Sequence, residues 1–353
     1  GVRIMAWTIN NGKLYFNTVL YTGNNTDNTS ITGVGFQPDW VWLKARNQAD
    51  YHYSLDAVRG VTKCIFQNDT SAESTFSDSL KSFNTDGFTL GTSGDLNAAS
   101  QTMVAWNWKA GTSFTNDASA TGIGTIDSTG SVNTDAGFSI ISYTGTGSAG
   151  TVAHGLGAVP KMIIIKSRNT VSLWGVYHQA IGNTHGLFLN ATNAATSLSA
   201  YWNNTSPTSS VFSLGGDADI NKSSDPLIAY CFAEKQGYSK FGSYTGNGNA
   251  DGTFVYTGFK PALVIIKRTT AGHDWYMNTA KINGYNVQND FLAPNEPAAE
   301  VVDNTAQPID MLSNGFKCRG TGGGNNESGV PYIYMAFAEN PFTSSTGTPV
   351  TAR

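Results

Sequence analysis

Charged side chains are scarce in this sequence. It contains 21 Lys and Arg against 25 Asp and Glu, together 13% of the chain, where about a quarter is usual in globular proteins. Neither sign forms a run, so no positively charged stretch is present that would attract nucleic acid or an anionic membrane surface. We therefore predict no nucleic-acid partner.

Cysteine and long apolar runs are also rare. The odd set of Cys64, Cys231 and Cys318 has no Cys-x-x-Cys pair, so it provides neither a disulfide framework nor a zinc site. Apolar stretches such as 227–233 are too short to span a membrane, and residues 1–20 do not resemble a secretory signal. We expect buried thiols, no metal, no cofactor and no membrane insertion. Because the chain starts at Gly1, we also expect a fragment or a processed product.

Known catalytic motifs are missing. No H-E-x-x-H, G-x-S-x-G, P-loop or G-x-G-x-x-G pattern occurs, and we predict no catalytic residues and no enzyme activity. A glycosidase would need only two carboxylates, which no spacing rule excludes. Residues 217–221 resemble the start of a calcium loop, but Lys222 and Ile228 replace its glycine and its last acidic ligand. A turn is the better interpretation.

What the sequence does contain is one pattern written three times. Each copy has Tyr-Thr-Gly, then Gly-x-x-Pro, then an apolar run that ends in Lys. The tyrosines Tyr21, Tyr143 and Tyr244 are 122 and 101 residues apart, and each copy closes on an aromatic strand. Such a tandem repeat is an internal alignment. We divide the chain into an N-terminal strand segment (1–18), repeat 1 (19–110), a Ser/Thr/Gly-rich linker with an added hairpin as the alternative (111–136), repeat 2 (137–242), repeat 3 (243–342) and a tail (343–353).

Strand signals dominate each copy. Short β-branched and aromatic runs are bounded by Gly, Asn, Asp, Ser and Pro, and runs such as 162–165 are apolar on both faces. Weak helical patterns occur only at 71–81 and 296–303. The sequence predicts an all-β fold of three tandem β-sandwich, jelly-roll-like repeats with few short helices. The alternative is one pseudo-threefold body that replaces a trimer.

Aromatic residues recur after each central strand. Ring faces stack on sugars while polar neighbours bind hydroxyl groups, so one interpretation is a ligand-binding face. The competing and favoured interpretation makes the anchors Tyr51, Trp174 and Trp275 part of the core. The candidate ligand-binding residues are Tyr53, Trp174, Tyr177, His178, His273, Trp275 and Tyr276.

The lysine that ends each central strand also has two interpretations. Lys44, Lys166 and Lys267 could bind an anionic sugar, but we favour a structural role, because long Lys side chains often pass along apolar surface and pair at their ends. Glu234 and Glu339 follow the closing strands of repeats 2 and 3, and are the expected partners of Lys166 and Lys267.

Several strings together resemble a repeat family of tailed phages. They are 142–145, 154–169, 201–204, 228–243 and 334–342, with the ending 350–353, and the resemblance covers about residues 19–353. The family occurs in virion structural or tail-fibre-type proteins, especially of marine phages. Residues 11–16 resemble one strand of a SPRY-like, lectin-fold module.

This resemblance implies a location rather than a chemistry. It implies a non-enzymatic virion protein, a tail fibre or appendage subunit that presents β-domains for host-surface attachment. The implied partners are other virion proteins, a host surface glycan or protein, and further copies of the chain in a homo-oligomer such as a trimer. Alternatives are a capsid decoration or head-fibre protein, and a polysaccharide-binding or depolymerising tailspike-type protein.

Overall fold

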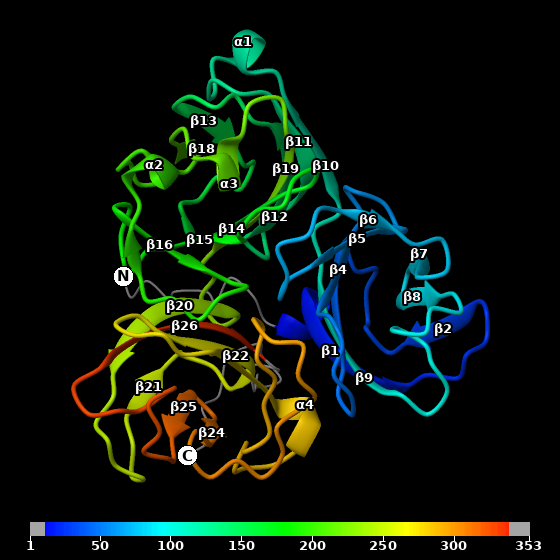
Figure 1. The fold of residues 1–353 in the computed structure, drawn as a ribbon, viewed down its shortest axis with the longest axis vertical. Coiled ribbons are helices and arrows are strands. Elements are labelled where there is room, and N and C mark those ends of the chain that lie inside the picture. Colours follow the sequence, from blue (N-terminus) through cyan, green and yellow to red (C-terminus); the bar gives the residue numbers. More distant parts are fainter. Residues whose placement is uncertain (1–10, 339–353) are drawn as a thin grey trace, which may run out of the picture.

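The fold is all-β, as predicted. The computed structural model describes residues 11–338, in which antiparallel strands pair into six sheets (Figure 1). Helices in this range are single turns: η1 (Gly12–Leu14), α1 (Ala118–Thr121), α2 (Ser199–Trp202), α3 (Ala218–Asn221) and α4 (Ala280–Asn283). The helical patterns at 71–81 and 296–303 were wrong. Leu80 begins a strand that pairs with β8 (Gly87–Leu90), and Val301 forms an isolated antiparallel bridge with Phe291.

Repeat 1 consists of a large and a small sheet. The large sheet has the order β1-β9-β3-β4-β5-β6 and the small sheet β2-β8-β7. The predicted boundary at residue 18 lies inside β1, and residues 11–16, for which the resemblance implied one strand of a SPRY-like module, include η1 and the first residue of β1. The strands of repeat 1 are β1 (Phe16–Thr22), β2 (Thr29–Thr32), β3 (Trp40–Ala45), β4 (Tyr53–Asp56), β5 (Lys63–Phe66), β6 (Ser74–Thr75), β7 (Leu80–Asn84), β8 (Gly87–Leu90) and β9 (Thr102–Trp108).

Repeat 2 is extended by the segment that was predicted as a linker. Residues 111–136 form the hairpin that we gave as the alternative: β10 (Thr112–Asn116) pairs with β11 (Ser128–Asn133), which pairs with β12 (Phe138–Thr144). The large sheet runs β10-β11-β12-β19-β14-β15-β16-β17 and the small one β13-β18. The other strands are β13 (Gly150–Ala153), β14 (Pro160–Ser167), β15 (Gly175–His178), β16 (His185–Phe188), β17 (Thr196–Ser197), β18 (Val211–Leu214) and β19 (Pro226–Ala233).

Repeat 3 has the same plan with the fewest strands in its described residues. Its sheets run β20-β26-β22-β23 and β21-β25-β24. The predicted boundary at residue 242 lies inside β20, and the tail 343–353 lies outside the described residues. The strands are β20 (Ser239–Thr245), β21 (Phe254–Tyr256), β22 (Pro261–Arg268), β23 (Trp275–Thr279), β24 (Ile309–Leu312), β25 (Gly315–Cys318) and β26 (Pro331–Ala338).

The strand order around the closing strand is the same in all three repeats. It is β1-β9-β3-β4, then β12-β19-β14-β15, then β20-β26-β22-β23. Central strands are buried on both faces, as their apolar runs predict. One face packs on the small sheet of the same repeat, where Val41 and Leu43 lie in repeat 1. The other face, with Trp40 and Trp42, turns inward.

The inward faces of the three large sheets meet in one central core. Trp40 of repeat 1 stacks on Tyr230 of repeat 2, with ring centroids 4.4 Å apart. Phe337 of repeat 3 lies 5.7 Å from Trp108 and 5.9 Å from Phe232. Figure 1 shows the result as three lobes around a common centre. Each repeat thus keeps a core between its own two sheets, and the three repeats also share one central core.

The Tyr-Thr-Gly motif joins the first strand of each repeat to the turn before its closing strand. In repeat 2 the Tyr143 hydroxyl donates to Ile220 O at 2.6 Å. A Cβ on Gly145 would lie 2.2 Å from Lys222 O, so only glycine fits. Asn221 then donates to two carbonyls and accepts from Thr146 N. The corresponding residues elsewhere are Tyr21, Gly23 and Asn97, and Tyr244, Gly246 and Asn326.

Candidate functional site

The residues that follow each marker Lys connect the repeats in a ring. Six positions after the Lys, a backbone N–H donates to a carbonyl of the preceding repeat. The three bonds are Ser172 N to Thr70 O at 3.0 Å, His273 N to Thr192 O at 2.9 Å, and Asp50 N to Pro297 O at 2.7 Å. They run from repeat 2 to 1, from 3 to 2 and from 1 to 3. The ring is therefore closed.

A second set of bonds runs beside the first and differs between interfaces. The backbone bonds Glu73 N to Arg168 O and Glu300 N to Arg46 O are 2.7 and 2.8 Å long. At both interfaces the Arg guanidinium also forms a two-pronged ion pair with the Glu carboxylate. The third interface has the same backbone bond at 2.9 Å but carries Ala195 and Thr269, which cannot form an ion pair.

The marker lysines are buried and bind backbone oxygens, which lie across an interface for Lys166 and Lys267 and within repeat 1 for Lys44. Lys166 Nζ donates to Thr70 O of repeat 1 at 3.1 Å and to Ser172 Oγ at 3.0 Å. Lys267 Nζ likewise donates to Thr192 O of repeat 2 at 3.1 Å. Burial lowers the pKa of each marker lysine to about 8. Their ammonium groups bind carbonyls of the fold and are buried, so an anionic sugar in solution does not reach them.

The expected pairing of Lys166 with Glu234 was wrong. Glu234 pairs with Lys240 at 2.8 Å, because Lys166 is buried and its ammonium group is surrounded by backbone oxygens. Glu339 lies outside the described residues, so the pairing predicted for Lys267 is not placed.

Trp174 and Trp275 are core anchors of the ring. Trp174 Nε1 donates to Phe66 O of repeat 1 at 2.8 Å, and Trp275 Nε1 to Phe188 O of repeat 2 at 2.9 Å. The equivalent residue in repeat 1 is His52. Its backbone N–H donates to an Asn side chain, as the backbone N–H groups of Trp174 and Trp275 do. The anchor in repeat 1 is thus His52 rather than Tyr51, whose side chain is 43% exposed.

The other candidate ligand-binding residues are also mostly buried. Tyr53 donates to Asp95, Tyr177 packs on Trp202, and Tyr276 packs on Phe291. His178 Nε2 lies 3.2 Å from Tyr334 O of repeat 3, and burial lowers its pKa to about 4. Only His273 is partly exposed, with its ring beside Arg268. These side chains therefore do not form an open stacking face: Tyr53, Trp174, Tyr177, His178, Trp275 and Tyr276.

The turn at Asp217 has a structural explanation. Asp217 caps α3, and the Asp219 carboxylate accepts from Leu173 N and from the Tyr201 hydroxyl. Across residues 11–338, no three His, Cys, Asp or Glu side chains gather as a metal site would require. No helix in the same range has both the length and the apolar character needed to traverse a bilayer.

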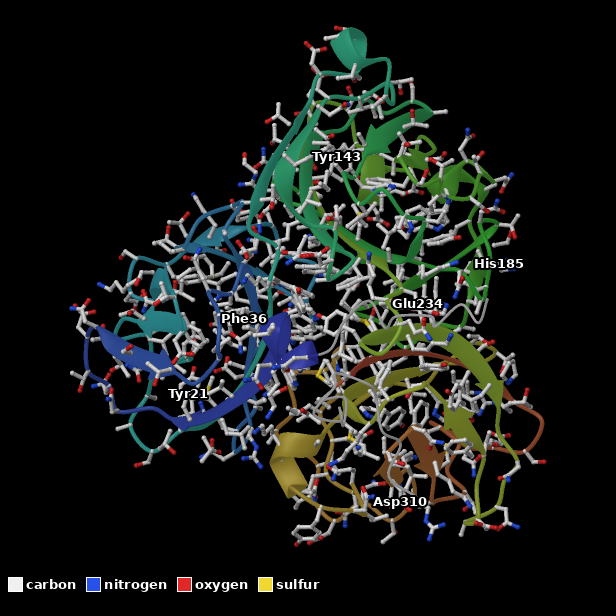
Figure 2. All side chains as sticks on the ribbon, turned by 180° about the vertical axis from the view of Figure 1, so that it is seen from behind. Tyr21, Phe36, Tyr143, His185, Glu234 and Asp310 are labelled. Atoms are coloured by element: carbon white, nitrogen blue, oxygen red, sulfur yellow. The ribbon has the colours of Figure 1, made fainter. Side chains whose placement is uncertain are left out.

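An open hollow lies at the junction of repeats 2 and 3. Its volume is about 310 Å³, and its walls are the connection from β19 to β20 and the end of β21. Tyr256, 60% exposed, is its one aromatic ring. Across the hollow lies the Glu234–Lys240 ion pair, and Figure 2 labels Glu234 between the two repeats. The hollow is lined by Glu234, Gln236, Gly237, Ser239, Lys240, Tyr256, Thr257 and Gly258.

Sequence reasoning missed Tyr256 because the loops before the Pro differ in length. The sheets give the correct alignment: Ile31, Val152 and Val255 are buried opposite Phe88, Phe212 and Phe316. The next residue is Thr32, Ala153 or Tyr256. The sequence signal for Tyr256 is that this aromatic residue occurs in one repeat only, directly after a position that is apolar in all three.

The repeats and their interfaces span most of the sequence, and so does one family model. The chain belongs to the family described as a domain of unknown function, DUF7483. The DUF7483 model matches residues 11–341, which includes all three repeats and every contact of the ring. Among curated proteins, no significant match was found.

Proposed function

We propose that this chain is a non-enzymatic structural subunit of a tailed-phage particle, in a tail fibre or appendage that attaches to the host surface. The observation that carries the proposal is the closed ring: three copies of one β-fold are locked by equivalent interface bonds around a shared aromatic core. A body held in this way displays its outer turns in fixed positions, which suits attachment.

The polar residues that recur support a structural role. Tyr143, Asn221 and Lys166, with their counterparts, are buried and bind backbone groups. Their recurrence follows from the fold, because each would leave a buried group unpaired if removed. The resemblance of the repeats to those of tailed phages supports placement on the virion.

The test is to locate the chain on purified particles with a specific antibody, and to measure binding of the purified chain to host cells. We expect label on the tail or its appendages and saturable binding to cells. Label confined to the capsid shell would overturn the tail placement. It would favour the decoration or head-fibre alternative, which the threefold arrangement of repeats also fits, since a threefold body can sit on a threefold axis. Mass measurement in solution would decide between monomer and trimer.

A further inference from the structure

We propose that the hollow at Tyr256 binds a neutral pyranose sugar of a surface glycan. The proposal rests on the attachment function above and names the site that would perform it. Tyr256 supplies the stacking ring, and Glu234 with Lys240 supplies the acceptor and donor for sugar hydroxyls.

The first argument is the comparison of equivalent positions in the three repeats. On the outward face of β21, Phe254 and Tyr256 are 44% and 60% exposed. The equivalent strands carry Ser30 and Thr32 in repeat 1, and Thr151 and Ala153 in repeat 2. Exposed aromatic rings are unfavourable in water, and the fold is built twice without them. Repeat 3 therefore carries aromatic rings on this strand that the fold itself does not require.

The second argument is a difference between repeats 1 and 3 at a position that borders the hollow. Four residues before the marker Tyr, repeat 1 has Asn17, whose side chain donates to Gly33 O and Val34 O at 3.1 Å. These two bonds connect β1 to the turn at Gly33 and Val34. Repeat 3 has Lys240 at this position, and Lys240 turns to Glu234 instead. The space beside the turn is left as the hollow.

The third argument concerns the shape and chemistry of the walls. The ring of Tyr256 passes close to Gly258, since a Cβ there would lie 3.6 Å from Tyr256 Oη. The turn places this glycine at φ +85°, so no side chain stands between the ring and the backbone of the turn. An aromatic face with a few placed polar groups in a cavity of this size matches a small-ligand site. The Glu234 carboxylate accepts and the Lys240 ammonium donates, which suits adjacent hydroxyl groups.

The charge of the hollow selects between kinds of sugar. Glu234 and Lys240 neutralise each other across 2.8 Å, so the site offers no net positive charge. A sugar carboxylate would gain no net attraction from this neutral pair to offset the cost of removing it from water. A neutral hexose or N-acetylhexosamine avoids this cost.

The experiment uses the full chain on an array of neutral and acidic bacterial-type oligosaccharides, followed by calorimetry with the strongest soluble disaccharide. We expect binding to neutral pyranose glycans. Tyr256→Ala should weaken it at least tenfold, and Glu234→Gln and Lys240→Met several-fold each. Tyr285→Ala is the matched control: Tyr285 is 77% exposed in the same repeat but does not line the hollow, so its removal should change affinity less than twofold.

Three results would overturn the proposal: no neutral glycan bound, binding to acidic glycans alone, or equal affinity of wild type and Tyr256→Ala. Binding of wild type and Tyr256→Ala to host cells distinguishes failure of the proposed glycan site from failure of the proposed attachment function. If wild type and Tyr256→Ala bind cells equally, the hollow is not the site but attachment stands. If wild type binds no cells, attachment fails whatever the array shows. Circular dichroism of each variant confirms that it folds.

Discussion

A few buried side chains perform the same task three times. The amide of Asn97 donates to Gly91 O and Thr26 O, and its oxygen accepts from Asn24 N. The glycine of Tyr-Thr-Gly packs directly against this turn. Since an unpaired buried amide or an added methyl group would each be costly, selection for the fold alone explains why these residues recur.

Substitution of the motif glycine should therefore destabilise the protein. In Gly23→Ala the new Cβ would lie 2.2 Å from Ala98 O, a backbone atom, and we expect a loss of roughly 3 kcal/mol in the free energy of unfolding. Gly94→Ala is the control, because no atom lies within 4 Å of its Cβ position. Urea denaturation measures both. Equal midpoints for the two variants would contradict the close contact.

His178 should make stability depend on acid pH. Burial lowers its pKa from 6.5 to about 4, so between these values the unfolded chain binds more protons than the folded one. Its contribution is complete above pH 6.5 and is lost as pH falls toward 4. His178→Gln removes this titration. Between pH 6.5 and 4 its free energy of unfolding should therefore fall by about 3 kcal/mol less than that of the wild type. Denaturation at a series of pH values tests this, and parallel profiles would refute it.

At the scale of elements, the repeats are joined through the loops after the central strands. Each loop crosses to the preceding repeat with backbone bonds, and two of the three interfaces add an Arg–Glu ion pair. The Glu300 side chain is only 5% exposed, so its bonds to Arg46 are shielded from water. Two-pronged, charge-assisted hydrogen bonds of this kind are stronger than ordinary surface pairs.

A double-mutant cycle should detect this difference. For Arg46→Met and Glu300→Gln we expect a coupling energy of about 1–2 kcal/mol. The control cycle uses Lys81 and Asp27, an ion pair at 3.1 Å in which both side chains are at least a third exposed. For this pair we expect a coupling energy of about 0.5 kcal/mol or less. Couplings of equal size would show that the ion pair does not strengthen the interface.

At the scale of the whole molecule, the central core ties the fate of each repeat to the other two. Trp40, Tyr230 and Phe337 come from different repeats and are buried only when all three are assembled. A single repeat would expose its inward sheet face to water, at about 25 cal/mol for each Å² of apolar surface.

The chain should therefore unfold in one transition. We expect tryptophan fluorescence and far-ultraviolet circular dichroism to give the same denaturant midpoint, as two-state behaviour requires. A fragment of residues 111–238, which contains repeat 2 alone, should show no cooperative transition. Separate midpoints for the full chain, or a stably folded fragment, would mean that the repeats are independent.

Part of the fold and of the site was predictable because it depends on local pattern. Alternating rings in 104–108 and the apolar run 162–165 predicted strands that are buried in the structure. The hairpin at residues 111–136 was not predictable in this way, because Ser and Thr are common both in linkers and in edge hairpins. Tyr256 was missed because loops of different length hid its alignment, and Trp174 looked available because a sequence does not record what packs upon it.

The sequence by itself determined that one β-fold is used three times, since period, turn residues and apolar strands are local properties. Only the tertiary structure decided that the three copies share a core. It also decided that Lys166, Trp174 and their counterparts belong to the interfaces between copies, and that Tyr256 faces a hollow. The physical reason is that the shared core and the interfaces join residues far apart in the sequence, such as Trp174 and Phe66. The hollow likewise depends on how β20 and β21 are placed beside each other, which no local pattern encodes.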